Sequence, residues 1–163
     1  SLYGGKIMSR ITDEIQRART NKITVPDELN DHDVIRGIYG IFSEKDDDSI
    51  CLYIGRSYSI ADRLFASGGH ICMFNSGCYK KLVPKMINES MMNGYHINIK
   101  ILEVVEFVGD NYYRDMQRLS FAEANLIEEY QLAGQCLQQL PEGTWISEEK
   151  WNKRYKKKHC SGK

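Results

Sequence analysis

Alternation of hydrophobic and polar positions predicts a β-hairpin in the first third of the chain. Two short apolar runs, residues 35–42 and 51–55, flank the polar stretch 43–49, which is rich in aspartate and serine. Apolar runs of this length, bounded by acidic and serine residues, are typical of paired strands, here joined by a long loop. We therefore expect the two runs to lie side by side.

Each predicted strand carries a tyrosine opposite its aliphatic face. Because side chains alternate across a strand, Phe42 takes one face of the first strand and Tyr39 the other, and Tyr53 lies opposite Leu52 and Ile54 on the second. A symmetric register sets Tyr39 opposite Tyr53, with Cβ atoms about 5 Å apart. If the aliphatic faces form the core, both phenols emerge on the far side, in one site.

The rest of the chain predicts helices and one further strand. Helical periodicity or capping signals mark residues 9–20, 60–66, 76–92, 115–130 and a basic segment from 150, and alternation marks a strand, possible bulge included, over 95–107. Pro84 makes the third helix begin late or kink, and Ser57 or Ser59 is placed to cap the second.

This order of elements predicts an α/β domain of the α+β type, with a small three-stranded, largely antiparallel sheet flanked by helices. We expect residues 1–30 to form an N-terminal helix and an extended lead-in, residues 31–141 the main domain, and residues 142–163 a basic C-terminal segment.

Length and composition favour one intracellular domain. The chain has 163 residues, a size typical of a single domain. Its apolar runs are far shorter than the ~20 residues that span a membrane, and its first ten residues lack the apolar core of a signal peptide. Five cysteines, an odd number without framework spacing, favour a reducing compartment. We expect a cytoplasmic protein that makes no membrane contact.

Charge is unevenly distributed along the chain. Residues 150–163 contain seven lysines and arginines and no acid, so this segment carries +7 and, because the net charge is zero, the remainder carries −7. A basic run beside Trp151 and Tyr155 is a candidate nucleic-acid arm, because lysines pair with phosphates and aromatic rings stack on bases. Its candidate DNA contacts are Lys153, Arg154, Lys156 and Lys157. The alternative is a solvated tail.

Glu123 is out of place on the strongest helical pattern. It falls inside the apolar stripe of the segment 115–130, which consists of Met116, Leu119, Leu126, Ile127 and Tyr130. Burying an unpaired carboxylate costs several kcal/mol. Such a residue is therefore expected to bind a metal ion, to pair with an arginine or to take part in catalysis. The alternatives are a structural Glu–Arg pair or a stripe edge that reaches water.

Two arginines and a cluster of metal-binding side chains follow the hairpin. Arg56 directly follows the second apolar run, and Arg63 lies ten residues after Tyr53 on the predicted helix 60–66. The alternative is that both are ordinary surface arginines without a functional role. His70, Cys72 and Cys78 raise the alternative of a zinc site, but no second cysteine or histidine pair completes four ligands.

These residues together resemble the motifs of the GIY-YIG endonuclease superfamily. The tripeptides are GIY at residues 37–39 and YIG at 53–55, and they are followed by Arg63 and by the segment 123–127, which has the form E-x-x-x-I. The resemblance spans roughly residues 35–140 and includes four elements in the order that the family has them.

The resemblance implies a metal-dependent DNA nuclease. Tyr39 would serve as general base for the attacking water, Tyr53 would position water or substrate, and Arg63 would stabilise the charge on the pentacoordinate phosphate. Glu123 would hold one Mg²⁺ or Mn²⁺ ion, for which a hard carboxylate oxygen is a suitable ligand. A free tyrosine has a pKa of about 10, so Tyr39 is a poor base unless a hydrogen bond or a neighbouring cation lowers its pKa. Arg56 or Arg63 could supply that cation.

Two positions depart from the family's pattern. Many members carry a histidine or tyrosine one helical turn after the arginine, where this chain has Ser67; His70 is the possible substitute. Many also carry an asparagine after the metal-binding helix, where this chain has Gln135, Gln138 and Gln139.

We therefore expect a metal-dependent endonuclease that hydrolyses DNA phosphodiester bonds. Arg56, Lys80 and Lys81 are further candidate DNA contacts, and a homodimer or a targeting partner is possible because the chain is short. The alternative is a GIY-YIG-shaped DNA-binding module with little or no catalysis.

Overall fold

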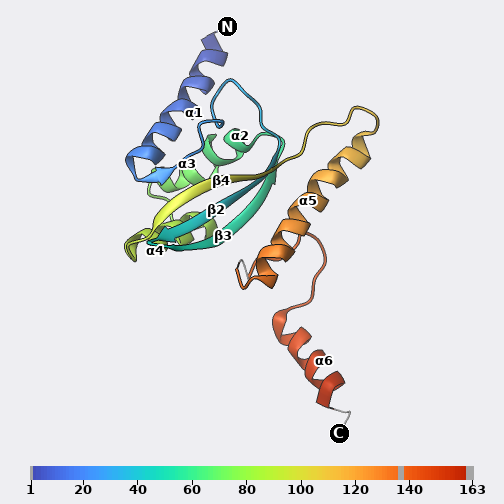
Figure 1. Cartoon of the computed structure of the whole chain (residues 1–163). Helices are drawn as coiled ribbons and strands as arrows, with labels where there is room; N and C mark the ends of the chain where they lie inside the picture. The colour runs from blue at the N-terminus through green and yellow to red at the C-terminus, as the bar shows by residue number, and fades with distance from the viewer. Residues whose placement is uncertain (1, 136–137, 161–163) are drawn as a thin grey trace.

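The computed structural model describes residues 2–135 and 138–160, with the side chains of residues 10–135 and 138–156. Its elements follow one another as α1 (Leu2–Thr20), β1 (Ile23–Thr24), β2 (Gly37–Lys45), β3 (Asp48–Ser57), α2 (Ile60–Phe65), α3 (His70–Asn75), α4 (Leu82–Met92), β4 (His96–Val104), α5 (Tyr112–Leu132) and α6 (Glu148–Cys160). The α+β class is confirmed: one sheet is flanked by helices (Figure 1).

The sheet has four strands and is mixed, so the prediction of three largely antiparallel strands is wrong in detail. The order is β1-β4-β2-β3, in which β2 runs antiparallel to β3 and β4 while β1 runs parallel to β4. Strand β1 is only two residues long and precedes Pro26. A segment that short shows no alternation, and for this reason the sequence indicated only an extended lead-in.

The predicted long loop of the hairpin is absent. Strands β2 and β3 continue through most of the polar stretch and are joined by a turn at Asp46 and Asp47. Asp46 adopts a positive φ of 54°, a conformation that aspartate tolerates better than most residues. Residues 45–49 of the stretch are exposed and carry no desolvation cost, whereas Ser43 is buried and Glu44 is partly buried.

A bulge changes the register that symmetry predicted for the two tyrosines. Tyr39 pairs with Gly55, and Tyr53 pairs with Ile41, while Phe42 pairs with Cys51, so Leu52 is an extra residue on β3. A bulge of this kind reorients the side chains on one side of it. As a result Leu52 packs against the same cluster as Tyr53, and not with Ile54 as the alternation predicted.

Strand β4 carries the bulge that its sequence suggested. Ile38 pairs with Glu103 and Tyr39 with Ile101, so Leu102 is the extra residue. The bulge shifts the alternation beyond this point: Val105 is buried, whereas Val104 is exposed.

Helices cover both faces of the sheet, so neither tyrosine emerges on a free face. Helices α1 to α4 pack on one face with β-strand residues that include Tyr39 and Ile41, and α5 packs on the other with Ile38, Phe42 and Ile54 (Figure 1). Tyr39 is fully buried in the first cluster, with 0% of its surface exposed. Tyr53 is partly buried against the same cluster.

A buried ion pair fixes α5 against the sheet. Arg36, just before β2, donates from Nη1 to Asp115 Oδ1 at 3.1 Å and from Nη2 to the Asp115 carbonyl at 2.9 Å. Its guanidinium also lies 4.4 Å from the centre of the Phe107 ring. Breaking one partner of such a buried pair is strongly destabilising. The contact joins residues 79 apart in the sequence and fixes the position of the helix that carries Glu123.

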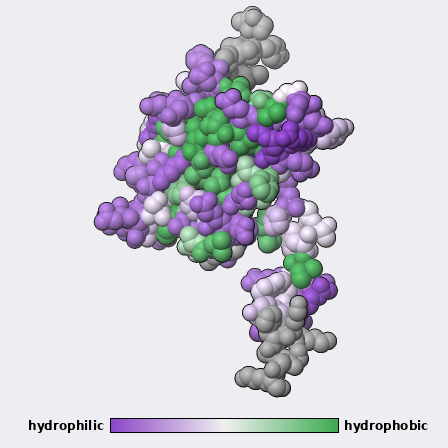
Figure 2. Space-filling view, turned by 45° about the vertical axis from the view of Figure 1, so that its right-hand side comes forward, coloured by the Kyte–Doolittle hydropathy of each residue, from purple (hydrophilic) through white to green (hydrophobic). Residues whose placement is uncertain are grey.

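Helices α1, α2, α4 and α5 end within two residues of the predicted positions, but α1 begins at Leu2 and not at residue 9. Ser59 caps α2 by accepting from the Asp62 amide, α4 begins late at Leu82, two residues before Pro84, and Ser147 caps α6. Helix α3 was not predicted. Helix α6 extends away from the body of the molecule (Figure 1, Figure 2). In the part of the chain that the structure describes, no helix is long and apolar enough to cross a membrane.

Candidate functional site

Three aromatic side chains meet on the face of the sheet that α2 and α3 cover. The ring centres of Tyr39 and Tyr53 lie 6.3 Å apart, and those of Tyr53 and His70 lie 5.3 Å apart with the rings edge to face. The tyrosines therefore lie side by side, as the sequence predicted, but as diagonal neighbours and not directly across the ladder. His70 joins them because α3, which it begins, packs against α1, α2 and α4.

The glycine of each tripeptide, Gly37 or Gly55, lies so close to a neighbouring group that no larger residue fits there. A Cβ atom at Gly55 would overlap the ring and hydroxyl of Tyr39, and a Cβ atom at Gly37 would overlap the carbonyl oxygen of Glu103 on β4. Neither neighbour can retreat easily, because one is a fully buried side chain and the other is backbone. Only glycine allows such an approach without strain.

Two buried polar atoms of this cluster make no hydrogen bond of ordinary geometry among the described residues: His70 Nε2, and Tyr39 Oη, which lies near the Arg63 guanidinium. Leaving such a group unpaired costs roughly 1–3 kcal/mol. Tyr39 and His70 are both residues that the sequence predicted to be catalytic. Unsatisfied groups of this kind are found where a substrate or water completes a site.

The environment shifts the pKa of all three aromatic residues. Burial, assisted by Tyr53 and Glu123, raises the pKa of Tyr39 well above its usual value, and Arg63 only partly offsets this. Burial also raises the pKa of Tyr53. Burial, together with the charges of Arg63 and Lys81, lowers the pKa of His70 to about 4. At neutral pH the phenols are therefore protonated and the imidazole is neutral.

Arg63 stands at the edge of this cluster. Ile60 and Leu64 are buried and hold α2 so that Arg63 is exposed. Its charge acts on both tyrosines and on His70. Arg63 also lines a hollow of about 360 Å³ with Ser67 and other residues after α2.

Glu123 has an arginine partner, one of the possibilities that its position on the stripe raised. Its Oε1 accepts from Arg56 Nη1 at 2.6 Å, and Arg56 Nη2 donates to Glu142 Oε2 at 2.7 Å. The Glu123 side chain is 17% exposed. The opposing charges of Glu142 and Glu123 outweigh the desolvation of Arg56 and raise its pKa above the usual value.

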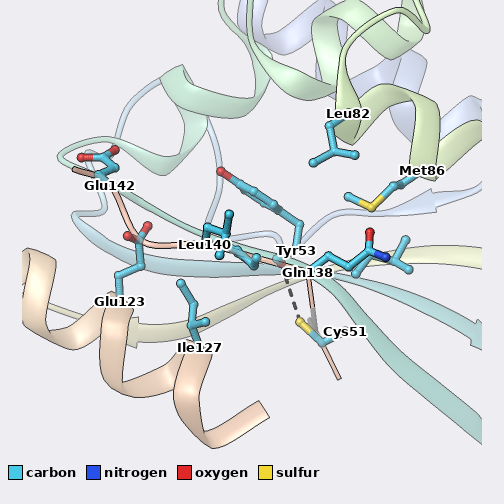
Figure 3. Close-up of a pocket in the computed structure, with 11 residues that line it drawn as sticks. Cys51, Tyr53, Leu82, Met86, Glu123, Ile127, Gln138, Leu140 and Glu142 are labelled. Carbon is cyan, nitrogen blue, oxygen red and sulfur yellow. Dashed lines mark hydrogen bonds between the residues drawn. The ribbon is translucent and has the colours of Figure 1, made fainter. Parts of the chain in front are cut away.

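Glu123 and Tyr53 line one pocket of about 500 Å³ between β3, α4 and α5. Figure 3 shows Glu123 and Glu142 close together at one end, with the Tyr53 ring extending toward them, while Leu82 and Met86 line another side. The pocket is closed by residues after α5, including Gln138 and Leu140. Glu142 was not predicted, because it lies in an irregular segment with no periodic signal.

Glutamines occupy the region where the family has an asparagine. Gln139 binds the free edge of β3 by accepting from the Ile54 amide at 3.0 Å and donating to the Ile54 carbonyl. Gln135 accepts from the Cys51 amide at 2.7 Å. Gln138 is exposed and lines the pocket.

The other candidate contacts fall into two groups. Lys80 and Lys81 are exposed just before α4, and the charge of Lys81 reaches His70. The basic side chains of α6 stand apart from this site: Lys153, Arg154 and Lys156 are exposed, and Lys153 donates to Glu149 at 2.8 Å. The side chain of Lys157 lies outside the described residues.

The alternative of a zinc site gains no support. Cys72 is buried and Cys78 is exposed. Within residues 2–135 and 138–156, no group of three or more histidine, cysteine, aspartate or glutamate side chains is arranged to hold a metal ion. A single ion held by one carboxylate and water does not need such a group.

Comparison of the chain with family models, with curated proteins and with solved structures found no match.

Proposed function

We propose that this chain is a metal-dependent endonuclease that hydrolyses DNA phosphodiester bonds through a GIY-YIG-type site. The observation that carries the proposal is the convergence of Tyr39, Tyr53 and His70 beside Arg63 and Glu123. Phosphodiester hydrolysis needs a group that handles the proton of water, a cation near the phosphate oxygens and a Lewis acid. Residues suited to each of these tasks lie together here.

Glu123 is the residue that fits a hard divalent ion such as Mg²⁺ or Mn²⁺. Its Oε1 is paired with Arg56, whereas its Oε2 makes no hydrogen bond or ion pair among the described residues. The adjoining pocket of about 500 Å³ has room for water ligands, which such ions retain. When bound, the ion would polarise the phosphate and stabilise negative charge on the leaving oxygen.

Arg63 and the tyrosines bind and orient the reactants in this proposal. The exposed guanidinium of Arg63 contacts two phosphate oxygens through its planar fork, which a lysine cannot reproduce. Tyr39 Oη, which makes no hydrogen bond of ordinary geometry among the described residues, contacts the attacking water. Because burial, with smaller contributions from Tyr53 and Glu123, raises the pKa of Tyr39, its phenol is protonated at neutral pH and orients the attacking water by a hydrogen bond.

His70 fills the second base position in this proposal. The low pKa keeps its imidazole neutral at neutral pH, and a neutral imidazole can accept a proton at one nitrogen. Its Nε2 has no partner among the described residues. Ser67 is exposed and has no comparable proton affinity.

The test is cleavage of supercoiled plasmid with Mg²⁺ or Mn²⁺ by the wild type and by Glu123→Gln. The variant should lose at least ~10²-fold in rate, the scale expected for removing a charge-stabilising group. Its stability should change by no more than about 1 kcal/mol, because the partly exposed Arg56 keeps Glu142 as a partner. Glu128→Gln, an exposed change on the same helix, should cut normally. Normal cutting by Glu123→Gln would remove Glu123 from the reaction.

A second candidate function is that of a DNA-binding module without catalysis. The observation that favours it is the 2.6 Å pair that ties Glu123 to Arg56 and so competes with a metal ion for the carboxylate. Specific DNA binding without cleavage in Mg²⁺ or Mn²⁺ would support this second function.

A further inference from the structure

A strap of residues 138–142 runs along the outer edge of β3. Gln135, Gln139 and Glu142 contact Cys51, Ile54 and Arg56 in turn, so the segment follows β3 in the same direction. The Gln131 side chain also donates to the Gln139 carbonyl at 2.9 Å. Side chains of this segment thereby bind backbone groups of an edge strand that would otherwise be open.

The strap crosses the hollow beside Glu123. One pocket of about 500 Å³ and another of about 480 Å³ share Glu123, Ile127, Gln139 and Glu142 as lining residues. The first pocket contains Tyr53, and the second contains Arg56. Residues of the strap therefore line two adjoining pockets between β3 and α5, the first of which is shown in Figure 3.

Arg56 is the charged anchor at the end of the strap. Its guanidinium binds two carboxylates at once, Glu123 through Nη1 and Glu142 through Nη2. The two acids differ in environment, because Glu123 is 17% exposed and Glu142 is 81% exposed. An ion pair with one exposed partner contributes only about 0–1 kcal/mol. Glu142 can therefore leave while Glu123 stays in place.

We propose that Glu142 occupies, in the free protein, the position that a DNA phosphate takes on Arg56, and that Glu142 thereby sets the affinity of the site for phosphodiesters. Carboxylate and phosphate oxygens are alternative partners for the guanidinium fork. The exchange of one anion for another keeps Arg56 paired. This proposal rests on the proposed function, because it takes DNA as the ligand of the site.

The experiment measures binding of a fluorescein-labelled DNA duplex by anisotropy, in EDTA so that no cleavage occurs. It compares the wild type with four variants: Glu142→Gln, Glu128→Gln, Arg56→Gln, and the double variant Glu142→Gln with Arg56→Gln. Glu142→Gln should bind roughly threefold to tenfold more tightly than the wild type, because the competing carboxylate is gone. Glu128→Gln is the matched control: it removes the same charge from the same hollow, and Glu128 has no ion pair among the described residues. Its affinity should change less than twofold.

The double variant Glu142→Gln with Arg56→Gln identifies the route of the effect. If Glu142 competes through Arg56, its removal should add nothing in a background that carries Arg56→Gln. Equal gains for Glu142→Gln and Glu128→Gln, or an undiminished gain in the Arg56→Gln background, would overturn the proposal. Thermal unfolding of each variant shows that it is folded.

The outcomes separate this proposal from the proposed function. Binding that does not depend on Glu142 overturns the role of Glu142 and leaves the nuclease assignment standing. Binding that depends on Glu142 and Arg56, in a protein that cuts no DNA with Mg²⁺ or Mn²⁺, supports the role of Glu142 and removes the nuclease assignment. Absence of duplex binding by every variant at low salt overturns both.

Discussion

His70 is the residue whose charge the fold controls most directly. It is partly buried, its Nε2 has no hydrogen-bond partner among the described residues, and Arg63 and Lys81 act on it with charges of the same sign as its own protonated form. Burial first, and then these two charges, lower the pKa to about 4. An unfolded histidine has a pKa of about 6.5, so the folded state favours the neutral imidazole.

A pH dependence of stability follows. Between pH 6.5 and 4 the unfolded chain binds a proton at His70 that the folded chain does not, so this residue should make folding less favourable as pH falls. The effect is at most about 1.4 kcal/mol per pH unit. Urea unfolding of the wild type and of His70→Gln should therefore show the wild type losing more stability over this range. Parallel curves would mean that His70 titrates normally.

Removal of the Tyr39 hydroxyl should affect cleavage far more than stability. Its hydroxyl is buried, makes no hydrogen bond of ordinary geometry among the described residues and lies near the exposed Arg63, so Tyr39→Phe should change the free energy of unfolding by no more than about 1 kcal/mol. Cleavage should fall by ~10²-fold, because the group that contacts the attacking water is removed. A loss of stability would show that the hydroxyl has a structural partner, and unchanged cleavage would remove Tyr39 from the reaction.

At the scale of elements, β2 and β3 form the site because their backbones approach their neighbours closely. Gly55 lies against the Tyr39 ring, and Gly37 lies against the β4 backbone. The bulge at Leu52 places Tyr53 beside Tyr39 on the covered face of the sheet. The geometry of the hairpin, more than its sequence alternation, sets how the phenols meet.

Gly55→Ala tests this dependence. The added methyl group overlaps the Tyr39 ring, which is fully buried, so we expect a loss of about 1–3 kcal/mol in stability and a larger loss of cleavage as Tyr39 shifts. Gly68→Ala is a control, because its Cβ atom would meet nothing within 4 Å; there the cost is only that of a positive φ. The Gly55 variant should have the lower cleavage rate at equal folded fraction, and equal rates would show that Tyr39 need not be held in place.

The sequence predicted correctly those features that depend only on residues close together in the chain. The apolar stripe of α5 and the Ser59 cap of α2 are properties of neighbouring positions, and both were predicted. The β3 bulge, the two-residue strand β1 and the Arg36–Asp115 pair depend on contacts between distant segments. Glu123 could be identified because it interrupts a periodic pattern. Glu142 could not, because no pattern surrounds it.

At the scale of the whole molecule, charge is separated between the body and the C-terminal helix. Residues 150–163 carry +7 and the rest of the chain −7, and α6 extends away from the body (Figure 1). A negatively charged body repels DNA unless local positive charge attracts it. Trp151 and Tyr155 stack on α6 with ring centres 5.1 Å apart, which adds exposed aromatic surface beside the basic residues.

Deletion of residues 150–163 should therefore weaken DNA binding without unfolding the body. If α6 binds phosphates, the slope of log K against log salt should fall by ~0.9 for each phosphate of duplex DNA that the shortened protein no longer neutralises. The melting temperature should change little, because neither core cluster includes any α6 side chain that the structure describes. Saturating DNA should restore much of the cleavage rate, since Tyr39, Arg63 and Glu123 remain. An unchanged salt slope would instead mean that the body binds DNA through its own cations, of which Arg63, Lys80 and Lys81 are exposed near the site.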